Sequence, residues 1–322
     1  MPDYRQRSMF LLTAVVAVAC SGLWASSSSA AIPRFGHAFL IVGENTSYEQ
    51  ITPAHAPFLT GTVKAQGAWL TNTHSFVKSS SLGQYIAMLS GQYTACEANN
   101  DLPDHCHQRV PNLFSQLTAT GRGWRDYEQS MPNACNPVDG GAAWARNIYS
   151  AHHNPALYFT QIQGGRVDEA ITPAAPCRRF DLPMGTTAPD DTSFLDHDLA
   201  SGDVGSLNVI VPNDCADGHD LCGTHDRVRQ FDDFLASEIP KIQASPAFGP
   251  DGVVFITWDE GSDPPYRPAH ILTAILGPQV RAGAIDRNRH DHYGLEHTLA
   301  TGLGLTPLAH ARAATPITTI WH

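Results

Sequence analysis

Four short apolar runs constrain the fold of this chain more than any other feature. They cover residues 37–43, 207–212, 252–258 and 271–276. Such runs, each ending at Gly, Pro or an acidic residue, are typical of strands buried on both faces of a parallel sheet. Helical patterns alternate with them, and one at about residues 228–242 should bend or fray at Pro240. We therefore expect an α/β fold with a parallel or mostly parallel sheet flanked by helices, and with functional groups at the carboxyl ends of the strands.

The composition changes between about residues 95 and 200. This region holds four cysteines and many Pro, Asn, Asp and Gly residues, with little periodicity. It predicts a loop-rich, disulfide-tied cap or insertion draped over the sheet, with a helix near residues 110–117 and a strand near 123–127. The pair His152 and His153, followed by Asn-Pro, favours a surface turn, with a substrate contact as the alternative.

The first 30 residues are typical of a secretory signal peptide. Arg5 and Arg7 precede an apolar run at 9–19, and small residues at 28–30 would allow cleavage. Residues 31–322 would then form a single domain in the periplasm or outside the cell. Cys20 follows Ala-Val-Ala, and lipid attachment there is a less favoured alternative. No later segment is apolar enough to span a bilayer.

Six of the seven cysteines lie outside this signal segment. An even number in an exported protein indicates disulfides. Proximity favours Cys96–Cys106, Cys135–Cys177 and Cys215–Cys222, one choice among about fifteen. Zinc binding by these cysteines is less favoured because no CxxC pair is present.

The formal net charge of −11 argues against nucleic acid as a general partner. It does not exclude a single anionic substrate, because a bound cation can dominate the local field. Nothing in the composition indicates an oligomeric state.

A run of serines at residues 79–81 stands directly before an apolar helical pattern. A serine at a helix N-terminus meets free N–H groups and the positive end of the helix dipole, which favour an anion such as phosphate. Ser81 is therefore a candidate nucleophile. A helix cap is the alternative, and Ser80 is one position away.

Carboxylates follow two of the apolar runs at once. Glu44 and Asn45 follow residues 37–43, and Asp259 and Glu260 follow residues 252–258. Adjacent carboxylates at the end of a buried strand are unfavourable unless they are paired or bind a metal. Carboxylate and amide oxygens suit a hard or borderline divalent cation. These four residues are candidate metal ligands, with polar turns as the alternative.

A third group of polar residues follows the run at 207–212. Acidic groups this close repel one another unless a cation compensates, so a metal or substrate contact is favoured over an Asx-rich turn. Its members are Asn213, Asp214, Asp217, His219 and Asp220. His292 stands at the start of a further expected helix, at about residues 293–303. Three roles stay open for it: a metal ligand, a phosphate contact or a helix cap.

Together these groups predict phosphoryl transfer. A serine hydroxyl beside a divalent cation can ionise near neutral pH and attack phosphorus. The product would be a phosphoserine intermediate that water later hydrolyses.

The order of these motifs resembles the bacterial phosphoesterase family of secreted acid phosphatases and phosphocholine-type phospholipases C, within the alkaline-phosphatase-like superfamily. The resemblance covers roughly residues 37–305 and is carried by five segments. They are Glu44-Asn45, Ser81-Leu82-Gly83-Gln84-Tyr85, the segment from Asn213 to Asp220, Trp258-Asp259-Glu260-Gly261, and His292-Tyr293.

The resemblance implies a role for each matching residue. Ser81 takes the nucleophile's position, and Glu44, Asn45, Asp259 and Glu260, completed by the Ser81 oxygen, take the positions of metal ligands. A second cluster, which holds another metal or contacts phosphate, would comprise Asp217, His219, Asp220 and His292. We assign catalytic roles to Ser81, His219 and His292, and substrate contacts to Gln84, Asp217 and Asp220, with one or two divalent cations as cofactor.

The short chain resembles the acid phosphatase branch, which includes secreted phosphatases acting on phosphoinositide monoesters. The expected substrate is therefore a small phosphorylated molecule, for which a phosphoinositide headgroup is a candidate. The segment around Ser81 lacks the histidine and prolines usual in the family and has Gln84 in place of asparagine. Two alternatives therefore stay open: a phosphodiesterase of the phospholipase C type, and an exported phosphate-binding protein without turnover.

Overall fold

The computed structural model describes residues 1, 31–75, 80–93, 99–140, 148–165, 174–223, 226–262 and 268–322. The expected signal peptide, Cys20 and Cys96 lie outside the described residues.

A nine-stranded sheet forms the centre of the protein, in the order β4-β3-β5-β1-β6-β7-β2-β8, with β9 paired to β2. All described strand pairs are parallel except those of β7, which runs antiparallel to both β6 and β2. The strands are β1 His37–Gly43, β2 Ala68–His74, β3 Trp124–Glu128, β4 Asp181–Pro183, β5 Leu207–Val211, β6 Gly252–Trp258, β7 His270–Leu276, β8 Ala284–Asp286 and β9 His290–Asp291. The expected α/β fold with a mostly parallel sheet is confirmed.

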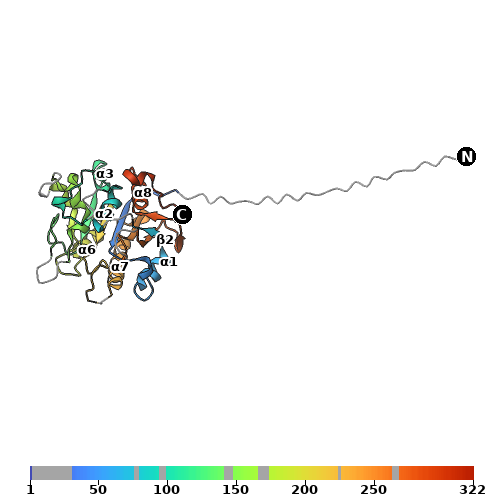
Figure 1. The fold of residues 1–322 in the computed structure, drawn as a ribbon, viewed down its shortest axis with the longest axis horizontal. Helices are drawn as coiled ribbons and strands as arrows, with labels where there is room; N and C mark the ends of the chain where they lie inside the picture. Colours follow the sequence, from blue (N-terminus) through green and yellow to red (C-terminus); the bar gives the residue numbers. More distant parts are fainter. Residues whose placement is uncertain are drawn as a thin grey trace.

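Helices cover both faces of the sheet. They are α1 Lys64–Gln66, α2 Ser81–Ser90, α3 Leu113–Ala119, α4 Thr160–Gln163, α5 Ala175–Phe180, α6 Ser193–Ser201, α7 Arg227–Ala244 and α8 His292–Gly302. In Figure 1, α2, α3 and α8 lie on one side of the strands, and α6 and α7 lie on the other. Helix α7 continues through Pro240 to Ala244, and Pro240 lies on its exposed side.

The period-two alternation of the strands divides the core between these two layers. Leu40 and Val42 of β1 pack into the cluster with α2, α3 and α8, whereas Phe39 and Ile41 pack into the cluster with α6 and α7. Because both faces of β1 are buried, the strand is apolar along almost its whole length, as its sequence indicates.

The region from residue 95 to 200 does more than cover the sheet. Its strands β3 and β4 extend the sheet beside β5, and its short helices include η5 Ala151–His153 and η6 Pro155–Tyr158. The expected helix and strand near residues 110–117 and 123–127 correspond to α3 and β3. β4 was not expected, because three residues carry too little alternation to be recognised.

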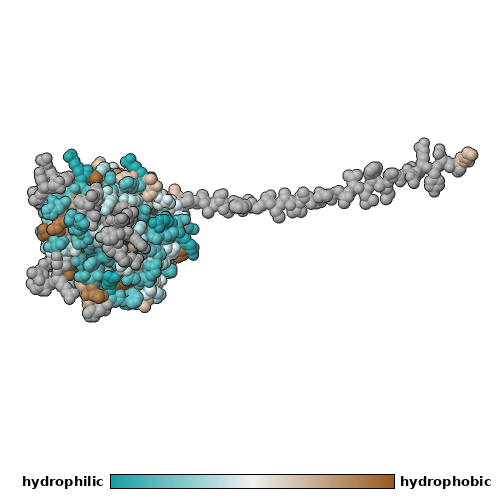
Figure 2. All heavy atoms as spheres, viewed as in Figure 1, coloured by the Kyte–Doolittle hydropathy of each residue, from teal (hydrophilic) through white to brown (hydrophobic). Residues whose placement is uncertain are grey.

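Two of the expected disulfides, Cys135–Cys177 and Cys215–Cys222, are formed, with Cα atoms 5.4 and 5.5 Å apart. They are compatible with an extracellular or periplasmic location. Among the described residues, no helix combines the length and apolarity needed to cross a membrane. On the face shown in Figure 2, hydrophilic residues cover most of the described surface.

Candidate active site

The predicted site residues converge because of the direction of the strands. Glu44 follows β1, Asp259 follows β6, Ser81 opens the helix after β2, and residues 213–220 follow β5. These four strands run parallel to one another, so their carboxyl ends meet at one edge of the sheet. Backbone hydrogen bonds join the ends: the Glu44 N–H donates to the Asp217 carbonyl (2.8 Å) and the Asp259 N–H to the Gly43 carbonyl (3.0 Å).

The two neighbouring serines, Ser80 and Ser81, have different hydrogen-bond partners. The Ser81 hydroxyl is buried and donates a hydrogen bond to Glu44 Oε1 at 2.8 Å. The Ser80 hydroxyl oxygen instead accepts a hydrogen bond from the Asn100 N–H at 3.3 Å. Ser80 has the extended backbone of a helix N-cap, and Ser81 is the first residue of α2. Ser81 is therefore the serine that faces the carboxylates.

Glu44, Asp259 and Glu260 form the first cluster of possible metal ligands. One carboxylate oxygen from each lies within 4.8 Å of the others. Asn45 is held beside them through its N–H, which donates to Asp259 Oδ1 at 3.2 Å. Its φ of 45° lies in the left-handed region, which asparagine adopts more readily than most residues and which redirects the chain after Glu44. Sequence reasoning named all four of these residues.

Burial and mutual repulsion oppose ionisation of this cluster. Burial, followed by the charge of Asp259, raises the pKa of Glu44 well above its usual value. Burial also raises the pKa of Asp259, and burial followed by repulsion from Asp259 raises the pKa of Glu260 to about 8. Glu44 Oε2 and Asp259 Oδ2 have no hydrogen-bond partner among the described residues. Buried, unpartnered carboxylate oxygens that converge fit a divalent cation, which would favour their ionised forms.

A second cluster contains Glu44, Asp217 and His153. His153 Nε2 lies 3.1 Å from Glu44 Oε2, and its Nδ1 lies 3.8 Å from Asp217 Oδ2 and 3.6 Å from Asp214 Oδ1. The expectation of a surface turn is wrong for His153, which is 3% exposed. The apolar segment that follows it, Ala156-Leu157-Tyr158-Phe159, is buried in the core. This apolar run is the sequence signal that favours a buried position for the histidine.

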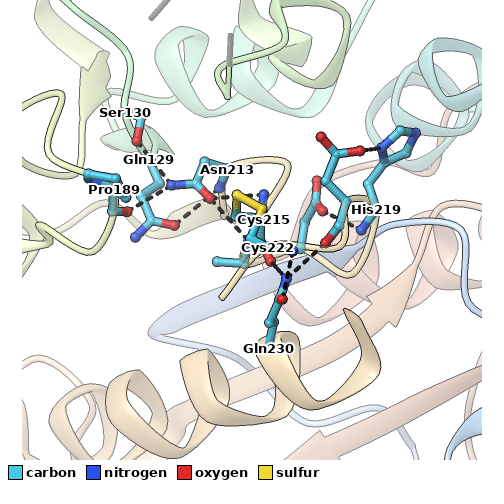
Figure 3. Close-up of a disulfide and its surroundings, with 11 residues drawn as sticks. Gln129, Ser130, Pro189, Asn213, Cys215, His219, Cys222 and Gln230 are labelled. Atoms are coloured by element: carbon cyan, nitrogen blue, oxygen red, sulfur yellow. Dashed lines mark hydrogen bonds and ion pairs between the residues drawn. A yellow bond between two sulfur atoms is a disulfide. The ribbon is translucent and has the colours of Figure 1, made fainter. Parts of the chain in front are cut away.

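The loop at residues 213–222 is held in place on several sides (Figure 3). The Asn213 side chain donates to Ser130 Oγ (3.0 Å) and to the Pro189 carbonyl (2.7 Å). From α7, Gln230 donates to the carbonyls of Cys215 and Asp220, and the disulfide closes the loop. Asp217 therefore projects into the site from a loop that is fixed at both ends.

Four predicted residues do not belong to either cluster: His219, Asp220, His292 and Gln84. His219 lies at the exposed end of the loop, where its Nδ1 is 2.9 Å from Asp220 Oδ1. His292 is fully buried; its Nε2 is 2.9 Å from the Trp258 carbonyl and its Nδ1 is 2.7 Å from Gln84 Oε1. Burial lowers the pKa of His292 to about 4. In this arrangement it joins Gln84 of α2 to the end of β6.

A cavity of about 550 Å³ borders the same loop, but it is separate from the clusters. Its lining includes Cys215, Cys222, Gln230 and Glu238, and none of Ser81, Glu44 or His153. The candidate site at the sheet edge is therefore distinct from this cavity.

With this geometry established, comparison with known proteins identifies the family. A sequence model of the Phosphoesterase family matches residues 39–306. The chain belongs to the phosphoesterase family. This phosphoesterase is accordingly a hydrolase acting on phosphoric ester bonds, as the sequence motifs predicted.

Two relatives carry phosphatase names. The phosphoesterase is 26% identical over 295 residues to a phosphatidylinositol-3-phosphatase of Mycobacterium tuberculosis, covering 91% of this chain and 85% of the relative. It is 23% identical over 281 residues to a phosphate-repressible acid phosphatase of Penicillium chrysogenum, covering 86% of this chain and 60% of the relative.

A solved structure confirms the fold. A protein in the alkaline phosphatase superfamily from Vibrio parahaemolyticus superposes with a TM-score of 0.56 at 13% identity, covering 84% of this phosphoesterase and 67% of that chain. The alkaline-phosphatase-like architecture expected from the sequence is confirmed.

Proposed function

We propose that this phosphoesterase is an exported, metal-dependent phosphomonoesterase that works through a phosphoserine at Ser81. The observation that carries the proposal is the 2.8 Å hydrogen bond from the Ser81 hydroxyl to Glu44, at the edge of a buried carboxylate cluster. A serine in this position has a proton acceptor beside it and lies at the positive end of the α2 dipole.

Glu44, Asn45, Asp259, Glu260 and the Ser81 oxygen would hold the divalent cation. When bound, the cation would lower the pKa of the serine hydroxyl and stabilise negative charge on the phosphoryl group. The family and the buried, unpartnered oxygens of Glu44 and Asp259 support this assignment.

The remaining steps use groups of the chain. The Ser81 proton leaves toward Glu44 Oε1 as Oγ bonds to phosphorus and the bond to the alcohol oxygen breaks. Water then attacks the phosphoserine, releasing phosphate and restoring the hydroxyl. His219 at the exposed end of its loop is suited to supply a proton to the departing alcohol, and Asp217, Asp220 and Gln84 to position the phosphoryl group and water.

The substrate class follows from the relatives. The M. tuberculosis protein is named for a phosphoinositide monoester and the fungal protein for acid phosphatase activity. We infer a small phosphorylated substrate, with a phosphoinositide headgroup as one candidate. Residues 1–30 would be removed on export, and residues 31–322, including the region at 95–200, would act as one domain.

Hydrolysis of a chromogenic phosphate monoester and the matching diester tests the proposal. We expect monoester cleavage that a chelator abolishes and added divalent cation restores. Ser81→Ala should lose about 10³-fold or more in kcat. Ser80→Ala should lose less than about tenfold, because the hydroxyl that donates to Glu44 belongs to Ser81, whereas the Ser80 hydroxyl accepts from the Asn100 N–H.

Other results would select the alternatives. Preference for the diester would indicate a phospholipase C type of reaction. Binding of phosphate without hydrolysis of either ester at any pH, with divalent cations added, would indicate a binding protein without turnover.

A further inference from the structure

We propose that the cavity beside the loop at residues 213–222 binds a small organic ammonium ion. The cavity has a volume of about 550 Å³, which is within the range of small-molecule sites in proteins. Its lining does not include Ser81, Glu44 or His153. Binding in this cavity therefore goes beyond the proposed phosphatase function and does not depend on it.

One face of α7 forms a wall of the cavity. Five lining residues of this helix follow the spacing i, i+3, i+4, i+7 and i+8, which places them along one stripe. They are Gln230, Asp233, Phe234, Ser237 and Glu238. The other lining residues come from the loop after β5, from the segment before α6 and from the residue that follows β3. Figure 3 shows part of this lining around the Cys215–Cys222 disulfide.

The charged side chains of the lining are all acidic. They are Asp190, Asp233 and Glu238, and the described lining residues include no lysine, arginine or histidine. Two cations approach these carboxylates without lining the cavity: Lys241 Nζ lies 2.9 Å from Glu238 Oε1, and Arg229 Nε lies 2.7 Å from Asp233 Oδ1. The second pair is about half exposed, so solvent screens it. The cavity therefore favours a cationic ligand.

Glu238 offers a buried acceptor to such a ligand. The residue is 2% exposed, and its Oε1 accepts hydrogen bonds from Thr192 Oγ1 (3.2 Å), Ser237 Oγ (3.0 Å) and Lys241 Nζ (2.9 Å). Its other oxygen, Oε2, is buried and has no hydrogen-bond partner among the described residues. A buried polar atom in this state usually has a ligand or a water that satisfies it. An ammonium N–H would give Oε2 a charge-assisted hydrogen bond.

The rest of the lining distinguishes an organic cation from a metal ion. Phe234, Pro189 and Ala216 supply apolar surface for a carbon chain, and the aromatic ring also attracts a cation. A metal ion would need several ligand atoms that converge. Glu238, Asp233 and Asp190 belong to none of the groups of described residues whose ligand atoms lie within 4.8 Å of one another. An alkylamine is therefore the class of ligand that the cavity fits.

The rival interpretation is that Glu238 holds a proton on Oε2 and that the cavity contains only water. Burial raises the pKa of Glu238, although Lys241 opposes the rise, and this favours the protonated form. A neutral acid would bind an alcohol as well as an amine of the same shape. The two interpretations therefore differ in how binding responds to the charge of the ligand.

The test is calorimetric titration of the full chain with 1,4-diaminobutane, with 1,4-butanediol as the uncharged molecule of similar shape. We expect saturable binding of the diamine at one site and no binding of the diol. Glu238→Gln, which removes the charge and keeps the shape, should weaken diamine binding by about tenfold or more. Asp233→Asn should weaken it severalfold, and this half-exposed position keeps the test valid if Glu238→Gln does not fold. Far-UV circular dichroism would check the fold of each variant.

Two further variants locate the bound diamine. Asp203→Asn removes a 76% exposed carboxylate that does not line the cavity, and it should leave the affinity unchanged. Glu44→Gln should also leave it unchanged, because Glu44 belongs to the carboxylates beside Ser81. Weaker binding in Glu44→Gln with unchanged binding in Glu238→Gln would place the diamine at the sheet edge and overturn the inference.

Three other results would also overturn it: no saturable binding of the diamine, equal binding of the diamine and the diol, or unchanged affinity in both Glu238→Gln and Asp233→Asn. None of these measurements involves hydrolysis of a phosphate ester. Their outcome is therefore independent of whether Ser81 forms a phosphoserine.

Discussion

Glu44 is the residue on which the site depends most. Its carboxylate accepts from Ser81, faces His153 and belongs to both ligand clusters, although it is fully buried. An isolated carboxylate in this position would be strongly disfavoured. Its ionised form at the end of β1 therefore needs a charge of opposite sign nearby.

Glu44→Gln should remove most of the activity while keeping the shape of the side chain. The glutamine amide has one uncharged oxygen, whereas the carboxylate has two oxygens that share a negative charge. The amide is also a poorer proton acceptor for Ser81. Loss of several kcal/mol of charge stabilisation corresponds to a fall in kcat of at least about 10²-fold. Steady-state kinetics at saturating Zn²⁺ would measure it. A fall of less than tenfold would show that Glu44 is dispensable.

Some residues of the candidate site could be predicted from the sequence and others could not. Asp259 and Glu260 could be recognised because two carboxylates directly after an apolar strand need compensation. His153 was missed, because the apolar segment that follows it stands in an irregular region whose pattern does not show which side chains turn inward. The choice between Ser81 and Ser80 also required coordinates, since both stand at the start of the same helix.

At the level of elements, the end of β1 is closely packed by its neighbours. A Cβ on Gly43 would lie 2.6 Å from a ring atom of Phe231 and 2.7 Å from the indole nitrogen of Trp258. Glycine is needed here because α7 and β6 approach the strand just before Glu44.

Gly43→Ala should therefore destabilise the protein by about 1–3 kcal/mol, which is typical of overpacking a core. Gly61→Ala is a matched control, because nothing lies within 4 Å of its Cβ position and alanine favours helical backbone. Urea unfolding of both variants measures the difference. Equal stabilities would show that the aromatic rings yield without strain.

Elements with strong patterns were predicted well and weak ones were not. β1, β5 and β6 are buried on both faces, and their sequences are apolar for that reason. The antiparallel direction of β7 leaves no trace in its own residues, because it depends on the connection from β6. β4 was missed because it has only three residues.

In the whole molecule, a second set of buried carboxyl groups lies on β3 and β4. Asp126 on β3 and Asp181 on β4 are paired in register and fully buried. Burial raises the pKa of Asp181 to about 8 and that of Asp126 well above its usual value. The fold therefore favours the protonated form of these groups.

This pair should make the protein less stable as pH rises. A raised pKa in the folded state gives a stabilisation that is complete below the unfolded value near 3.8 and is lost as pH approaches about 8. Asp181→Asn cannot ionise, so the loss of unfolding free energy between pH 5 and 8 should be smaller than in the wild type by roughly 4 kcal/mol. Urea unfolding across this range, at one fixed Zn²⁺ concentration, measures both slopes. Identical slopes would contradict the prediction.

The overall architecture could be predicted because alternating strands and helices have few ways to pack, and parallel strands bring their carboxyl ends together. What the sequence could not provide was the packing of the region at 95–200, whose contacts depend on irregular backbone. That region extends the sheet and also supplies His153 to the site.

Ser81 should carry the phosphoryl group during turnover. Acid quenching of the enzyme during hydrolysis of a phosphate monoester, followed by mapping of the phosphopeptide by mass spectrometry, would detect it. We expect one phosphate on Ser81 in the wild type and none in Ser81→Ala. Phosphate on Ser80, or an unmodified enzyme during active turnover, would contradict it.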